Sequence, residues 1–210
     1  MWIMSKVHVL CVLYSPIFAD TDGSNAELDL PMKHYFVFDL DNTLVKTNLA
    51  NNNSYKEAIH AVLDMDVQMK SHVRFTRKRL STLFAHISPS ILSQIIELKE
   101  TLFEKHLSET VVNSQLVKCL VFLNKKGYET ILLTESRQIR AQQVCDFHDL
   151  GHFFCQKYYL EDYHNEVKYQ FLYSKGIPQH SIVLFENEQN EIQNAIRNGI
   201  PEEQIIKVKF

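Results

Sequence analysis

Short apolar runs alternate with helix-like segments along most of the chain, and this alternation constrains the fold more than any other feature. The apolar runs have the length of buried strands and lie at 34–40, 130–134, 181–185 and 205–210. Apolar residues at helical spacing follow the later runs or precede them, at 116–126, 137–150, 168–175 and 191–198. Such alternation is typical of right-handed crossover connections. We therefore expect an α/β fold with a Rossmann-like parallel sheet core flanked by helices on both faces.

A helical block separates the first apolar run from the second. Apolar residues recur at helical spacing from about residue 54 to residue 107, and Ser88-Pro89 predicts the start of a helix within the block. The polar run Asn51-Asn52-Asn53 precedes the pattern, and we expect it to form a surface loop.

Length and composition limit the classes of protein to consider. The chain has 210 residues, of which 45% are hydrophobic and 22% charged, as expected for one globular domain with at most a small inserted module. The net charge of −3 argues against a nucleic-acid partner bound by bulk electrostatics. The spacings of the four cysteines and ten histidines match neither a disulfide framework nor a zinc motif, so we expect reduced thiols and no zinc. No apolar run reaches the roughly 18 to 20 residues that predict a transmembrane helix.

The N-terminal segment 1–31 is predicted to be an extension of the core. An apolar run at 7–14 follows Lys6, and Ala19 could end a signal peptide. Polar residues and a proline interrupt this run, and Met32 is a second plausible start. An extra strand or helix, or a misassigned start, is therefore favoured over a signal peptide. The expected location is cytoplasmic, with a secreted or periplasmic location as the alternative if 1–31 contains a signal.

Polar and acidic residues follow three of the predicted strands directly. Ligands bind at the carboxyl ends of the strands of an open parallel sheet, so these residues are the candidates for a functional site. They are Asp39 and Asp41 after the first run, Thr134, Glu135 and Ser136 after the second, and Glu186, Asn187 and Glu188 after the third. Two carboxylates at one strand end suit a cation and proton transfer, whereas the simpler alternative is that Asp39 and Asp41 cap a turn.

The run Phe38 to Val45 (FDLDNTLV) resembles the first motif of the haloacid dehalogenase superfamily, and the later strand ends follow in the expected order over 33–210. The resemblance implies that Asp39 is a nucleophile that forms an aspartyl phosphate. It also implies that Asp41 protonates the leaving alkoxide and then activates water. An aspartate at the second position resembles the phosphatases and mutases of the superfamily.

The second and third motifs are matched by single residues. Ile131 to Thr134 (ILLT) resembles the second motif, in which Thr134 binds the phosphoryl group, although a threonine here also suits a helix N-cap. Ser136 is better placed to cap the following helix. For the third motif we choose Lys168, which would balance the charge of the phosphoaspartate. Lys157 and Lys175 remain alternatives, because the frequent Lys-Pro pair is absent.

The fourth motif departs from the family pattern at its acid. The frame from Phe185 to Ile200 resembles the motif, but the metal-binding aspartate falls on Asn187. The resemblance implies a Mg²⁺ cofactor, for which Asp39, Asp41 and Asn187 are the expected ligands. A neutral amide lowers the charge of a hard-cation site, so Glu186 or Glu191 would have to restore it, or the metal would bind weakly.

The helical block resembles the cap that many members insert between the first two motifs. This places a small all-helical cap at 48–112 and the core at 32–47 and 113–210. The cap carries five cations within ten residues, which could bind an anionic substrate or an acidic surface, although a solvated helix face is favoured: Lys70, Arg74, Arg77, Lys78 and Arg79.

The resemblance predicts a Mg²⁺-dependent phosphomonoester hydrolase with a phosphorylated small molecule or a phosphoprotein as substrate. A catalytically weakened member that acts as a binding module is the alternative from another class. A phosphotyrosine phosphatase and a phosphomutase are further variants of the enzyme hypothesis.

Overall fold

A five-stranded parallel sheet forms the centre of the computed structural model, which describes residues 34–163 and 166–210. The predicted extension 1–31 lies outside the described residues. The strand order is β5-β4-β1-β6-β7, and all neighbouring pairs are parallel. The bounds are β1 Tyr35–Phe38, β4 Glu129–Leu133, β5 Gln156–Tyr158, β6 Ile182–Glu186 and β7 Ile205–Lys207. The predicted parallel α/β fold is therefore confirmed.

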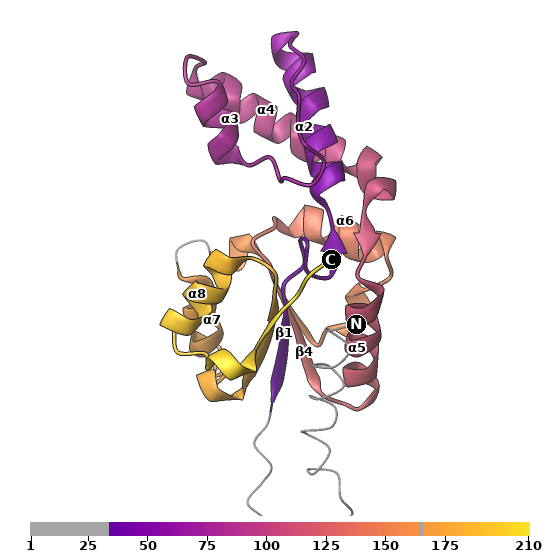
Figure 1. Ribbon diagram of the computed structural model, residues 1–210, viewed down its shortest axis with the longest axis vertical. Coiled ribbons are helices and arrows are strands. Elements are labelled where there is room, and N and C mark those ends of the chain that lie inside the picture. The colour runs from indigo at the N-terminus through magenta and orange to yellow at the C-terminus, as the bar shows by residue number, and fades with distance from the viewer. Residues whose placement is uncertain (1–33, 164–165) are drawn as a thin grey trace, which may run out of the picture.

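Helices cover both faces of this sheet (Figure 1). Helices α5 (Ser114–Lys125) and α6 (Gln138–Phe147) pack on one face, and α7 (Lys168–Ser174) and α8 (Gln189–Arg197) pack on the other. Short 3-10 helices complete the connections: η3 Gly151–Phe153, η4 Leu160–Asp162, η5 Gln179–Ser181 and η6 Glu202–Gln204. Strand β1 therefore has to be apolar on both sides. Phe36 and Phe38 face α5 and α6, whereas Val37 belongs to the core under α7 and α8.

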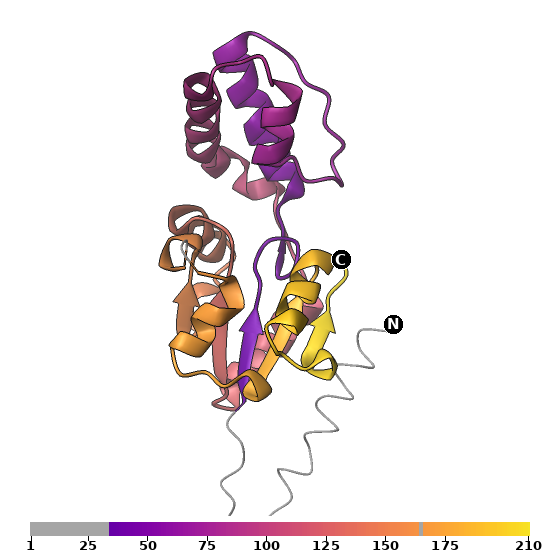
Figure 2. The ribbon, with the colours of Figure 1, turned by 90° about the vertical axis from the view of Figure 1, so that its left-hand side faces the viewer.

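The segment between β1 and α5 forms a second, mostly helical unit (Figure 2). It contains α2 (Asn48–Leu63), α3 (Arg77–Leu83), α4 (Pro89–Leu102) and the 3-10 helix η2 (Phe103–Glu109). These helices surround their own apolar core, which includes Tyr55, Phe84 and Ile95. Residues 64–76 form an irregular connection, with a turn near residues 71–73, rather than a helix.

A two-stranded antiparallel ribbon joins the helical unit to the sheet domain. Strand β2 (Val45–Lys46) leads into the unit and β3 (Val111–Val112) leads out of it, with Val45 paired to Val112. The segment proposed as the cap, 48–112, thus ends in a short strand.

The prediction that Asn51-Asn52-Asn53 forms a surface loop is wrong. These residues lie within α2, and Asn51 and Asn52 are buried. Their side-chain amides form hydrogen bonds with backbone groups of the 64–76 connection, which has no regular secondary structure to pair them. Asn51 donates to the carbonyl of Phe75 at 2.9 Å, and Asn52 donates to the carbonyl of Val73 at 2.8 Å and accepts from Phe75 N–H at 2.9 Å. The asparagine run holds this connection against the helix, because buried backbone groups need such partners.

Within the described ranges, no helix combines the length and apolar character needed to cross a membrane.

Candidate active site

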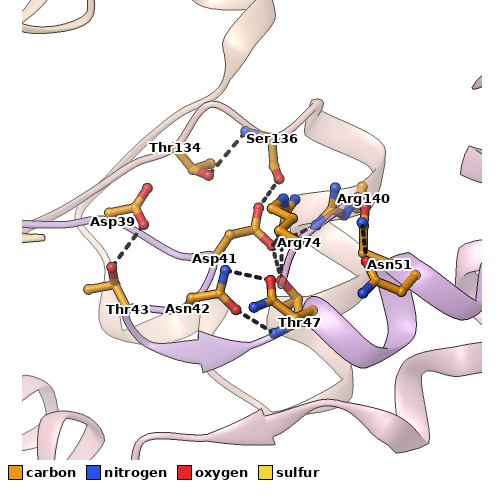
Figure 3. Close-up of polar contacts among 12 residues, drawn as sticks. Asp39, Asp41, Asn42, Thr43, Thr47, Asn51, Arg74, Thr134, Ser136 and Arg140 are labelled. Carbon is orange, nitrogen blue, oxygen red and sulfur yellow. Dashed lines mark hydrogen bonds and ion pairs between the residues drawn. The ribbon is translucent and has the colours of Figure 1, made fainter. Parts of the chain in front are cut away.

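A tight turn after β1 fixes the two predicted acids. The carbonyl of Leu40 accepts hydrogen bonds from the N–H groups of Thr43, Leu44 and Val45, and Asn42 adopts a left-handed conformation with φ 60°. Asparagine tolerates this region better than most residues. The turn directs Asp39 and Asp41 to different partners (Figure 3). Both residues line the same pocket.

Asp39 is 7% exposed and is bracketed by a hydroxyl and an ammonium group. The Thr43 hydroxyl donates to Asp39 Oδ2 at 2.9 Å, and Lys168 Nζ lies 3.4 Å from Asp39 Oδ1. Burial and the nearby Glu186 carboxylate raise the pKa of Asp39 above its ordinary value, against the opposing effect of Lys168. Two buried carboxylates thus compete for one ammonium group.

The end of β6 supplies the second of these carboxylates. Glu186 Oε2 lies 3.3 Å from Lys168 Nζ, while Glu186 Oε1 accepts the N–H groups of Asn187 and Glu188 at 2.8 and 3.0 Å. The amide oxygen of Asn187 lies 2.9 Å from the Thr43 hydroxyl, which links it to Asp39. One buried oxygen of Glu191 has no hydrogen-bond partner.

Asp41 is held by two arginines and two hydroxyls. Its Oδ1 lies 2.6 Å from Arg140 Nη2 and 3.4 Å from Arg74 Nη1, and it also accepts the Thr47 hydroxyl. Its Oδ2 accepts the Ser136 hydroxyl. Burial disfavours the charged form, but the two arginines and the hydroxyls outweigh it and hold the pKa of Asp41 well below its usual range. The Asp41 side chain therefore points at cations, and its role as a metal ligand stays a prediction.

Neither of the two hydroxyl residues after β4 caps the following helix. Thr134 Oγ1 accepts the N–H of Ser136 at 3.1 Å, so its own proton can be donated to a ligand. Ser136 donates to Asp41 and does not cap α6, contrary to prediction. Instead, a carboxylate oxygen of Glu161 accepts the N–H of Gln138 at 2.9 Å at the start of α6.

Of the three candidate lysines, Lys168 is the one beside Asp39. It is the first residue of α7, and it is buried. Burial alone would lower its pKa, but Asp39, Tyr169 and Glu186 raise it well above the ordinary value, so the ammonium form is stabilised. Lys157 Nζ donates to the carbonyl of Gly151 at 3.1 Å, and Lys175 lies over the ring of Phe171.

The oxygen ligands near Asp39 have the chemistry that a hard cation such as Mg²⁺ requires. They are carboxylates of Asp39, Glu186 and Glu191 and the amide oxygen of Asn187. The unpartnered oxygen of Glu191 and the excess of carboxylates over ammonium groups fit such a cation. In the part of the chain that the structure describes, no three His, Cys, Asp or Glu side chains form a ready-made cluster for a metal.

Both units line one pocket of about 420 Å³. Asp39, Asp41, Thr134 and Lys168 line it from the sheet domain, as do Glu186 and Glu191. Of the five cap cations in the sequence, Arg74, Arg77 and Lys78 line the pocket. Arg74 is bound to Asp41, so the expectation of a solvated helix face is wrong for this residue.

Sequence reasoning missed several residues of the pocket, chiefly Arg140 and Lys99. Both are buried, and both come from helices whose apolar pattern was taken as their main feature. A buried charge requires a partner, but the partner of Arg140 is 99 residues away in the chain. The single available signal was a cation on the apolar side of each helix.

Comparison with known proteins identifies a family over most of the chain. Residues 36–202 match the family model of haloacid dehalogenase-like hydrolases. A haloacid dehalogenase-like family hydrolase from Streptococcus pneumoniae is 17% identical, with 81% of this chain and 83% of that chain covered and a TM-score of 0.67. CbbY from Rhodobacter sphaeroides, solved in complex with phosphate, is 15% identical, with 85% and 87% covered and a TM-score of 0.71.

A predicted phosphoglycolate phosphatase from Haemophilus somnus is 15% identical, with 86% of each chain covered and a TM-score of 0.70. At these identities the solved structures establish a shared fold. A search of curated proteins finds no match.

Proposed function

The chain belongs to the haloacid dehalogenase-like hydrolases, and on this basis we propose that it is a Mg²⁺-dependent phosphomonoester hydrolase that works through an aspartyl phosphate on Asp39. The observation that carries the proposal is the setting of Asp39. Its carboxylate lies at the carboxyl end of the central strand, beside the buried ammonium of Lys168 and in a pocket that Thr134 also lines. Attack on phosphorus needs an anionic oxygen and nearby groups that bind the phosphate oxygens.

In the proposed reaction a carboxylate oxygen of Asp39 attacks phosphorus, and the bond from phosphorus to the ester oxygen breaks. Asp41 donates a proton to the leaving alkoxide, a step that requires its ion pairs with Arg140 and Arg74 to loosen first, because they hold it as the carboxylate. Lys168 and the Thr134 hydroxyl bind the non-bridging phosphate oxygens. In the second half of the reaction Asp41 accepts a proton from water, which attacks phosphorus and releases phosphate from Asp39. Arg140 and Arg74 stabilise the carboxylate form of Asp41, which is the form that accepts this proton.

Asp39, Asn187, Glu186 and Glu191 are the residues that would hold Mg²⁺. When bound, the ion would neutralise phosphate charge and orient the phosphoryl group for attack. Glu186 supplies the negative charge that Asn187 lacks, and it does so from the strand that ends beside β1.

The proposal is tested by phosphate release from an aryl phosphate and a panel of phosphorylated metabolites and phosphopeptides, with and without Mg²⁺. Asp39→Asn should abolish turnover and leave the thermal unfolding midpoint within about 2 °C, because the amide cannot attack phosphorus. Mass spectrometry of acid-quenched protein should find a phosphoryl group on Asp39 of the wild type. More than a tenth of wild-type turnover in a folded Asp39→Asn variant would contradict the nucleophile assignment.

A second candidate is a weakened family member that binds phosphorylated ligands without rapid turnover. The neutral Asn187 amide at the position of a metal-binding acid favours it. Measurable binding of phosphate esters by a wild type that hydrolyses none of them, with turnover gained in Asn187→Asp, would favour this candidate over the first.

A further inference from the structure

The pocket has a basic end, and two of its cations, Arg77 and Lys99, have no part in the proposed reaction. Four cations from different segments line it: Arg74 from the 64–76 connection, Arg77 from α3, Lys99 from α4 and Arg140 from α6. Each of these cations forms an ion pair with one of two acids. Arg74 and Arg140 pair with Asp41, and Arg77 and Lys99 pair with Glu100, at 3.5 and 3.3 Å respectively. Four cations therefore share two carboxylates.

Lys99 is the most buried of these cations. Its side chain is 2% exposed, and its ammonium lies 3.3 Å from one oxygen of Glu100. Its other neighbours include the rings of Tyr55 and Phe103, at 5.2 and 5.6 Å from the ammonium. An ammonium group has three protons to donate, and a buried charge is unfavourable unless it is paired. Burial, followed by Arg140, lowers the pKa of Lys99 to about 7, although Glu100 opposes the effect.

Two buried polar atoms at this end have no hydrogen-bond partner. They are Nε of Arg140 and Oε2 of Glu100. Both residues line the pocket with Lys99. The spare ammonium protons of buried Lys99 and the unused N–H of Arg140 are donors that an anionic group of a ligand would accept from, whereas Glu100 Oε2 needs a donor such as a ligand hydroxyl.

We propose that the basic end of the pocket binds a second anionic group of the substrate, a carboxylate or a phosphate, with Lys99 as its central contact. The substrate would then be a small phosphate ester that carries a second acidic group. A volume of about 420 Å³ shared by both ends favours a compact metabolite over a phosphopeptide. This inference rests on the proposed function for the placement of the first phosphate.

Binding of phosphonates tests the inference without turnover, because a carbon–phosphorus bond is not hydrolysed by phosphate-ester chemistry. Calorimetric titration with Mg²⁺ present would compare phosphonopropionate with butylphosphonate, which has a neutral tail of similar size. Propane diphosphonate in a third arm distinguishes a phosphate-binding end from a carboxylate-binding end. Wild type should bind at least one of the two doubly acidic ligands about tenfold or more tightly than butylphosphonate, as expected for a charged hydrogen bond.

Lys99→Met removes the charge but keeps the length of the side chain, and it should reduce the preference to less than about threefold without weakening butylphosphonate. Lys99→Arg should retain most of the preference. The matched control is Lys105→Met, an exposed cation of the same helical unit that does not line the pocket. It should behave as wild type. Thermal unfolding of each variant verifies the fold.

Equal binding of all three phosphonates by wild type, or an unchanged preference in folded Lys99→Met, would overturn the inference. So would the absence of binding by any phosphonate. The proposed function is judged separately, by turnover of a simple aryl phosphate. Turnover of the aryl phosphate without a preference for doubly acidic phosphonates would overturn the inference and leave the proposed function standing. A preference for doubly acidic phosphonates without turnover would overturn the proposed function and support the anion site.

Discussion

The pair of Arg140 and Asp41 should be a major contributor to the stability of the junction between the helical unit and the sheet domain. Their side chains are 8% and 15% exposed, and the closest nitrogen and oxygen are 2.6 Å apart. The guanidinium also lies 4.5 Å from the centre of the Phe103 ring. Arg140→Met would keep much of the packing on Phe103 but leave the Asp41 carboxylate with weaker partners.

Breaking a buried ion pair from one side typically costs about 3 to 5 kcal/mol. Arg74, at 3.4 Å, and the hydroxyls of Thr47 and Ser136 remain bound to Asp41 in the variant. We therefore expect Arg140→Met to lower the free energy of unfolding by about 3 kcal/mol, the low end of this range. Asp41→Asn should restore part of the loss in the double variant. The coupling energy of the double-mutant cycle should be about 1.5 to 3 kcal/mol.

The assay is urea unfolding at pH 7, followed by circular dichroism, for wild type, both single variants and the double variant. The control is Arg137→Met, an exposed arginine just before α6, which should change stability by less than about 0.5 kcal/mol. Because the pair holds the pKa of Asp41 below its usual range, its contribution is fully present above about pH 4 and is lost as the pH falls through the folded-state pKa. A coupling energy below about 0.5 kcal/mol at pH 7 would refute the assignment of this pair as a stabilising contact.

Three further predictions concern other parts of the molecule. Asn52→Ala should lower the unfolding free energy by about 2 to 3 kcal/mol, because buried backbone groups of the 64–76 connection lose their partners; a change below about 0.5 kcal/mol in urea unfolding would contradict this role. Asn187→Asp should lower the Mg²⁺ concentration that gives half-maximal activity, and Glu186→Gln and Glu191→Gln should raise it if these acids compensate; four identical curves would remove all three residues from the metal site. Binding of phosphonopropionate relative to butylphosphonate should weaken as the pH rises above about 7, because Lys99, whose pKa is lowered to about 7, then loses its proton. The charged and titratable groups that surround Lys99 are Arg74, Arg77, Arg140, Tyr55 and Glu100. Lys99→Arg should remove this pH dependence, and a wild-type binding ratio that is constant from pH 6 to 9 would contradict it.

The parts of the fold that depend on local pattern were predictable from the sequence. Strand β1 was expected because an apolar run that ends on acids is typical of a buried parallel strand, and β4, β6 and β7 followed in the same way. The resemblance of the first motif then ordered the strand ends, and it led to the choice of Lys168, which does lie beside Asp39. The short strand β5 (Gln156–Tyr158) has no counterpart among the four predicted apolar runs, since three residues at the edge of a sheet carry little pattern.

The errors have a common physical cause, which is that the partner of a polar side chain is set by the tertiary fold. Asn51 and Asn52 have the composition of a loop, yet they lie in a helix because their amides satisfy the backbone of a connection more than 20 residues later. The partners of Asp41 were not predicted either: they are Arg140 and Arg74, which come from α6 and from the 64–76 connection. No local spacing relates these residues.

The ribbon of β2 and β3 at the base of the helical unit would allow the whole unit to be replaced by another inserted segment. Because Val45 and Val112 are directly paired, the chain enters and leaves the unit at neighbouring points. The insertion therefore connects two paired strands, as the loop of a β-hairpin does. A different insertion, grafted between Lys46 and Val111, would alter the walls of the pocket while Asp39, Thr134 and Lys168 kept their supports in the sheet domain. The architecture thus permits new substrate preferences to evolve, or to be engineered, through replacement of one continuous segment.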